Sequence, residues 1–117
     1  MSIAYEDQEG RLHRTFGEPA YELFEPSNGK ILERQFVEHG HEHRLGHKPS
    51  YQTFDPISGC VTFERWMEQN RLRPEGITSI SRSADGKIKE TVRRLDGRQH
   101  VEKYDHDAAV DTSEPSP

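Results

Sequence analysis

An internal repeat of about 30 residues constrains this sequence more than any other feature. The same amino acid recurs 30 positions later at Pro19, Tyr21, Phe24, Pro26 and Gly29, and also at Gly10, His13 and Arg14. One residue inserted near Thr62 would move the offset to 31, which is how a β-bulge looks in a sequence. A period of this length is typical of chains built from stacked supersecondary units.

The repeat sets the expected organisation of the chain. A single β-repeat domain is predicted for residues 1–104, and in a third, eroded copy Ile80 takes the place of Tyr51. The units are about 5–34, 35–65 and 66–93, followed by a half-repeat at 94–104. Residues 105–117 hold four acids and neither Lys nor Arg, so a disordered acidic tail is predicted there.

Each unit has the pattern of a strand, a turn and a second strand. Asn28-Gly29, Asp85-Gly86 and Asp96-Gly97 are strong hairpin signals, because such pairs tolerate a positive φ. The flanking residues alternate, and no window has an apolar period near 3.6, so little helix is expected. The predicted fold class is all-β, an antiparallel β-meander of repeated hairpins in a single or curled sheet.

One face of this sheet is expected to carry an apolar strip, while the opposite face is charged and wet. The candidates for the strip are Tyr21, Leu23, Ile31, Phe36, Tyr51, Val61, Phe63, Trp66, Ile80, Ile88 and Val92. A strip left open on a single layer also favours homodimerisation as an alternative.

Composition excludes several classes of protein. Only 30% of the residues are hydrophobic and 32% are charged, so the core must be thin. No apolar run reaches the ~18 residues of a membrane span. The first 20 residues lack the apolar segment of a signal peptide, so a cytoplasmic protein is expected. The net charge is −5 and most of it lies in the tail, so duplex DNA is not an expected partner.

Residues 10–20 resemble the G-k-L-H-R-x-x-G-P-A unit of short β-repeat proteins related to MORN-like repeats. This unit occurs in small bacterial and phage-encoded proteins, including antitoxin-like ones. The resemblance covers roughly residues 4–100 and implies a binding scaffold rather than an enzyme. Glu18 splits the Gly-Pro-Ala of the pattern, and the third copy lacks its His.

The leading functional prediction is a non-enzymatic protein that binds another protein and needs no cofactor. An inhibitor, antitoxin or immunity protein of bacterial or phage origin, acting by steric blockade, fits the size and the repeat. Aromatic side chains flanked by arginine dominate the binding energy of many interfaces. The predicted partner-binding residues are therefore Tyr21, Phe36, Tyr51, Phe54, Arg65 and Trp66.

A histidine cluster offers a second hypothesis, a metal-binding protein or metal-dependent enzyme. Its members are His39, His41, His43 and His47. On one strand, alternate residues point the same way, so three imidazoles could converge on a metal ion. Gly40 matches a turn glycine of the first copy, Gly10, and a turn there would splay the ligands.

Three further features of the sequence bear on function. The stretch 87–103 is the most basic part of the chain, which favours an RNA-binding hairpin as a third hypothesis, although acids are interleaved with the bases. The repeated Arg14 and Arg44 could bind an anion, but their repetition favours pairing with repeated acids such as Glu33 and Glu64. Cys60 lacks a general base at local spacing, so a small buried side chain is expected there.

Overall fold

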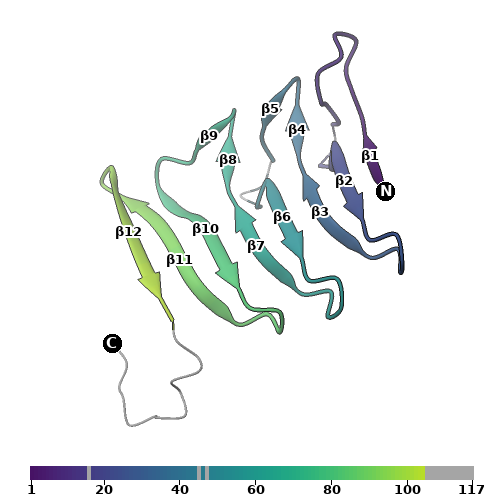
Figure 1. Cartoon of the computed structure of the whole chain (residues 1–117). Coiled ribbons are helices and arrows are strands. Elements are labelled where there is room, and N and C mark those ends of the chain that lie inside the picture. Colours follow the sequence, from purple (N-terminus) through teal and green to yellow (C-terminus); the bar gives the residue numbers. More distant parts are fainter. Residues whose placement is uncertain (16, 45, 47, 105–117) are drawn as a thin grey trace.

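The protein is an open, one-layer antiparallel sheet in the computed structural model, which describes residues 1–15, 17–44, 46 and 48–104 (Figure 1). No helix occurs among these residues. The predicted disordered tail, 105–117, and His47 lie outside them. The principal extents of 58, 43 and 17 Å describe a slab about as thick as one sheet with its side chains.

Eight strands form the main sheet, and neighbours in the sheet follow their order along the chain. They are β1 (Ser2–Ala4), β2 (Tyr21–Phe24), β3 (Ile31–Gln35), β6 (Tyr51–Phe54), β7 (Val61–Arg65), β10 (Gly76–Arg82), β11 (Ile88–Leu95) and β12 (Arg98–Lys103). Two small hairpins lie where strands of the main sheet end. The first pairs β4 (Val37–Glu38) with β5 (His41–Glu42), and the second pairs β8 (Met67–Glu68) with β9 (Arg71–Leu72).

The hairpin turns show why Asp-Gly and Asn-Gly pairs mark strand reversals. Asp96 and Gly97, which join β11 to β12, have φ values of 54° and 76°, as a tight two-residue turn requires. At Asn28-Gly29 and Asp85-Gly86 only the glycine has a positive φ. Those two pairs lie in wider turns, in which Gly29 donates to the Glu25 carbonyl at 2.7 Å and Gly86 donates to the Ser83 carbonyl at 2.9 Å.

The registers correct the predicted insertion near Thr62. Tyr21 lies opposite Gln35 in the first hairpin, and Tyr51 lies opposite Arg65 in the second, so the offset stays at 30 through both strands. A β-bulge is present at Thr62, which falls between the paired residues Val61 and Phe63. The first hairpin has the same register shift, so the bulge adds no residue to the second.

The third hairpin is also shifted from the predicted alignment. Ser79, not Ile80, is the residue that corresponds to Tyr51. Arg65 is the counterpart of Gln35, and Ser79 lies opposite Arg65 just as Tyr51 lies opposite Gln35. The connection that leads into β10 is shorter: Phe36 donates to the Ser50 carbonyl, whereas Trp66 donates to that of Thr78. A shift of one residue moves a side chain to the other face of a sheet.

The apolar residues are not gathered on one face, as the sequence predicted. Directly paired residues share a face, which places Tyr21, Tyr51, Phe63 and Val92 on the side that we call the Tyr51 face. Ile31, Val61, Ile80 and Ile88 lie on the opposite side, the Gln52 face. The strip divides because each bulge changes which residues of a strand face the same way.

Few apolar side chains are fully buried. Among the described residues they are Ala20, Phe36, Val37 and Ile80. Phe36 and Val37 lie where the chain leaves β3 for the first small hairpin, so the most buried apolar contacts form between that hairpin and the end of the sheet.

Phe36→Ala tests whether these contacts hold the fold. The ring is only 2% exposed, so its loss should lower the free energy of unfolding by about 3 kcal/mol. Urea denaturation followed by circular dichroism measures the change. Ile57→Ala, at a side chain 82% exposed, is the control and should stay within about 0.5 kcal/mol of the parent. Equal effects of the two substitutions would contradict this account of the core.

Candidate functional site

The candidate site is built around Tyr51 near the middle of the sheet. Tyr51 lies between Gln35 of β3 and Arg65 of β7, and its ring meets Phe63 edge-on with centroids 6.2 Å apart. The guanidinium carbon of Arg65 lies 4.6 Å from the centre of the Tyr51 ring, a cation–π distance. These half-buried side chains share the Tyr51 face with Tyr21.

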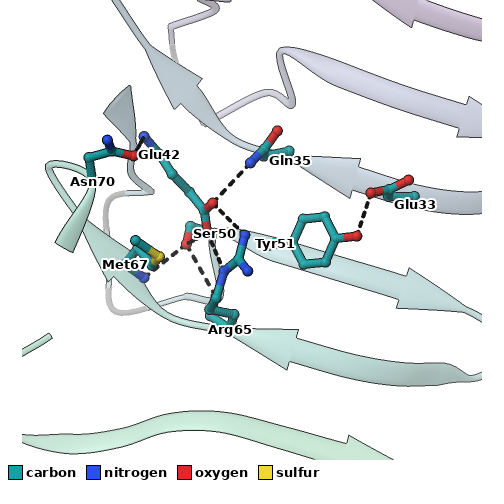
Figure 2. Close-up of polar contacts among 8 residues, drawn as sticks. All are labelled: Glu33, Gln35, Glu42, Ser50, Tyr51, Arg65, Met67 and Asn70. Carbon is teal, nitrogen blue, oxygen red and sulfur yellow. Dashed lines mark hydrogen bonds and ion pairs between the residues drawn. The ribbon is translucent and has the colours of Figure 1, made fainter. Parts of the chain in front are cut away.

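Glu42 holds the Arg65 guanidinium in place (Figure 2). Arg65 Nε donates to Glu42 Oε2 at 3.0 Å and Nη2 donates to Oε1 at 2.7 Å, a bidentate pair. Glu42 is 4% exposed, and the pair keeps the pKa of Arg65 above its usual value. The geometry therefore fixes both the direction and the charge of the cation over the Tyr51 ring.

Further donors surround the Glu42 carboxylate. Gln35 Nε2 and Ser50 Oγ each donate to it at 2.9 Å, and Ser50 Oγ also accepts the Met67 backbone N–H at 2.9 Å. The Glu42 backbone N–H donates to Asn70 Oδ1 at 3.4 Å. Glu42 thus joins its own hairpin to the sheet through its carboxylate and to the second small hairpin through its backbone N–H, as the dashed lines of Figure 2 show.

The Tyr51 hydroxyl donates a short hydrogen bond to Glu33 Oε2 on β3. Burial and then this contact with Glu33 raise the pKa of Tyr51 to about 12. The phenol is therefore a neutral donor at physiological pH, and its ring is held on one side by Arg65 and at its tip by Glu33.

A polar ladder crosses the opposite face of the same strands. Arg34 Nε donates to Gln52 Oε1 at 2.6 Å, and Gln52 Nε2 donates to Glu64 Oε2 at 3.0 Å. Arg82 Nη1 closes the ladder on Glu64 Oε1 at 2.9 Å. The ladder joins β3, β6, β7 and β10, so both faces of the central sheet are tied by side chains across strands.

The structure separates the six predicted partner-binding residues. Tyr21, Tyr51 and Arg65 share the Tyr51 face. Phe54 lies on the Gln52 face, with the guanidinium carbon of Arg34 5.5 Å from its ring centre. The remaining two residues, Phe36 and Trp66, occupy equivalent places just after β3 and β7.

Two of these residues are covered by arginine. Phe36 is buried under Arg44, whose guanidinium carbon lies 3.8 Å from the ring centre. The Phe36 ring is therefore not accessible to a binding partner. Trp66 is half-buried, and Arg73 lies 5.3 Å from its ring centre.

The repeated arginines close loops within their own units. Arg44 Nη1 donates to the Pro49 carbonyl at 3.1 Å, and Arg14 Nη1 donates to the Pro19 carbonyl at 3.4 Å. This corrects the predicted pairing with Glu33 and Glu64. In each case the hydrogen-bond acceptor is a carbonyl five residues ahead, and Arg14 Nη2 also lies 3.9 Å from Glu18 Oε1.

The histidine cluster does not form a row of ligands. His39 has a φ of 48° and Gly40 one of 81°, so the chain turns between β4 and β5 and the expected alternation is broken. Within the described part of the chain, no three potential ligand side chains are grouped as a metal site. His39, His41 and His43 therefore do not converge as strand alternation predicted, and metal binding by this group of histidines stays a prediction.

His39 instead joins an acid from the first unit. Its Nδ1 lies 3.0 Å from Asp7 Oδ2, and its ring stacks on His13 with centroids 3.9 Å apart. The His39 backbone N–H donates to His13 Nδ1 at 2.8 Å. The bond to His39 holds the pKa of Asp7 well below its usual range. An open hollow of about 380 Å³ lies beside this cluster.

The basic stretch 87–103 occupies β11 and β12 at one end of the sheet. Its charges are partly neutralised, since Arg93 lies 3.8 Å from Glu102 and Lys87 lies 4.0 Å from Asp85. RNA binding there stays a prediction. Cys60 is a half-buried free thiol. No helix long and apolar enough to span a membrane occurs among the described residues.

Glu42, on which the candidate site depends, is not among the residues predicted from the sequence. The signal was present, since the corresponding residues of the other units are Leu12 and Leu72. The backbone bonds show this equivalence: Gly40 donates to the Leu12 carbonyl as Asn70 donates to that of Glu42. An acid at a position that is otherwise leucine, with an arginine on a neighbouring strand, is typical of a buried ion pair.

Comparisons of this chain with protein-family models, with curated proteins and with solved structures found no significant match.

Glu42→Ala should lower the free energy of unfolding by about 3 kcal/mol, because it leaves Arg65 and Ser50 without their shared acceptor. Urea denaturation measures the loss. Glu68→Ala, an exposed acid on β8, is the matched control and should change stability by less than about 0.5 kcal/mol. A Glu42 variant as stable as the control would show that the cluster contributes nothing.

Tyr51 should ionise near pH 12. Folding favours the neutral phenol, so its contribution to stability is full below pH 10 and is lost as the pH rises towards 12. Tyrosinate absorbance of the parent minus that of Tyr51→Phe gives the transition of this side chain, with circular dichroism recorded at each pH to exclude unfolding. Glu33→Gln should move the midpoint down. A midpoint near 10 in the folded parent would contradict the assignment.

Proposed function

We propose that this chain is a non-enzymatic protein-binding protein that covers a partner's surface with the Tyr51 face of its sheet. The observation that carries the proposal is the Arg65 guanidinium, fixed by Glu42 and set over the Tyr51 ring. Arginine and tyrosine are enriched among the residues that dominate binding energies. Because the contacts already order these side chains, binding would cost little further entropy.

The shape of the molecule supports a covering role. A one-layer slab of 58 by 43 Å offers a broad face, and no second layer packs on the described part of the sheet. Such a face suits steric blockade, in which a partner's active or binding surface is masked. An inhibitor, antitoxin or immunity protein acting on a cytoplasmic partner is the class that combines this shape with the resemblance of residues 10–20.

We further infer that the sheet is a meander of repeated hairpins, about 30 residues to a unit. The strands β6 and β7 start 30 residues after β2 and β3, have the same lengths and carry the same register shift. The loop bonds from Arg14 and Arg44 recur with the same spacing. Repetition would let the partner-binding face lengthen with the number of units.

A capture experiment with face-specific variants tests the proposal. Tyr21 and Glu22 are neighbours on β2 whose side chains point to opposite faces, so Tyr21→Lys and Glu22→Lys place the same charge on different sides. Tagged parent protein should recover one host protein in about equal amount. Tyr21→Lys should reduce that recovery at least tenfold, and Glu22→Lys should leave it unchanged.

The same samples can also give the results that would contradict the proposal. Circular dichroism and urea titrations confirm that both variants are folded. Loss of the partner with Glu22→Lys alone would move the binding surface to the Gln52 face and contradict the proposal. A native mass that includes a metal ion, with no protein recovered, would contradict it in favour of the metal hypothesis.

A further inference from the structure

The strand β12 forms one edge of the sheet, and no strand among the described residues pairs with its outer side (Figure 1). It pairs with β11 on one side, and all six of its residues are exposed. An edge strand of this length presents a row of unpaired backbone groups that can template another strand. At the opposite edge, β1 has only three residues.

The register identifies which backbone groups of β12 are open. The Tyr104 N–H donates to the Lys89 carbonyl at 2.8 Å, and bonded pairs alternate along an antiparallel ladder. Arg98, His100 and Glu102 therefore direct their N–H and C=O groups to β11. Gln99, Val101 and Lys103 direct theirs outward, away from the sheet.

We propose that two copies of this chain associate through antiparallel pairing of β12, with Val101 opposite Val101 on a two-fold axis. Each copy then places His100 opposite Glu102 and Gln99 opposite Lys103 of the other. The outward groups of these strands make about six hydrogen bonds, two for each bonded pair. An isologous contact of this kind closes after two copies.

The side chains favour this register over its neighbours. Centring on His100 would set the two imidazoles opposite each other and place Lys103 against the turn at Gly97. Centring on Glu102 would oppose two carboxylates, which is unfavourable. In the Val101 register no like charges are directly opposed, and His100 meets an acid on each copy.

A row of apolar side chains crosses the contact between the two β12 strands. Val101 is 46% exposed and lies directly opposite Val92 of β11 within one chain. Pairing through Val101 therefore sets four valines side by side across two copies. The two-fold axis stands perpendicular to the sheet, so both Tyr51 faces end on the same side, and the dimer is bivalent for whatever binds that face.

The experiment uses the full chain at tens to hundreds of micromolar in sedimentation equilibrium, together with two proline variants. Val101→Pro removes an outward N–H and leaves the bonds to β11 intact, because position 101 does not donate to that strand. Ala4→Pro is the matched control on β1, where the neighbouring Tyr5 N–H donates to the Ala20 carbonyl and the residue 4 N–H points outward.

The expected result is a mass of twice the 13.6 kDa chain for the parent and for Ala4→Pro. Val101→Pro should raise the dissociation constant at least tenfold while its circular dichroism stays that of the parent. Val101→Cys in a Cys60→Ser background gives a second measurement, a disulfide-linked dimer on mild oxidation that Ala4→Cys in the same background should not give.

Three results would overturn the proposal. One is a monomeric parent across this range, and another is a dimer that Val101→Pro leaves unchanged. The third is a ladder of higher oligomers abolished by either proline, which would show head-to-tail pairing of β12 with β1. The edge is separate from the Tyr51 face, so failure here leaves the capture experiment with Tyr21→Lys unaffected.

Discussion

A sheet of one layer has no opposing layer to bury its side chains, and the rest of this structure follows from that constraint. Only Ala20, Phe36, Val37 and Ile80 are buried apolar residues in the part of the chain described. The sheet must therefore be stabilised by contacts between side chains of neighbouring strands. Long side chains make these contacts, since arginine stems and aromatic rings cover one another across strands.

On each face, networks of polar side chains hold neighbouring strands together, a role that a second packed layer has in a β-sandwich. On the Tyr51 face the buried Glu42 carboxylate gathers Arg65, Gln35 and Ser50, and on the other face Glu64 gathers Gln52 and Arg82. A satisfied network of this kind specifies one arrangement, because any slip of register would leave buried charges without partners. The same residues thus set the register and position the aromatic rings.

The sequence predicted the strand-turn-strand pattern well because turn chemistry is local. Gly29, Gly59 and Gly86 mark strand reversals that depend on nothing farther along the chain. The side on which residues lie was not predictable in the same way, because the bulge at Thr62 changes the alternation by one residue and the loop before Ser79 is two residues shorter than its counterpart. These shifts are set by pairing between strands, which no short window contains.

Prediction of the candidate site failed in a different manner. Tyr51 and Arg65 were found because aromatic residues and arginine have a recognisable role at interfaces, yet Phe36 was chosen on the same ground and is buried. What separates them is the arginine partner: Glu42 holds Arg65 at the side of Tyr51, whereas Arg44 closes directly over Phe36.

Corresponding hairpins of this sheet share backbone geometry, and particular residues depart from that correspondence. Glu42 in place of Leu12 and Leu72 is such a departure, and it produces the fixed cation of this face. The last unit departs in another way, since β12 ends the sheet with an exposed polar strand and nothing in the described chain pairs with its outer edge. The sheet thus owes its distinct surfaces to single residues such as Glu42 and to the way its last strand ends.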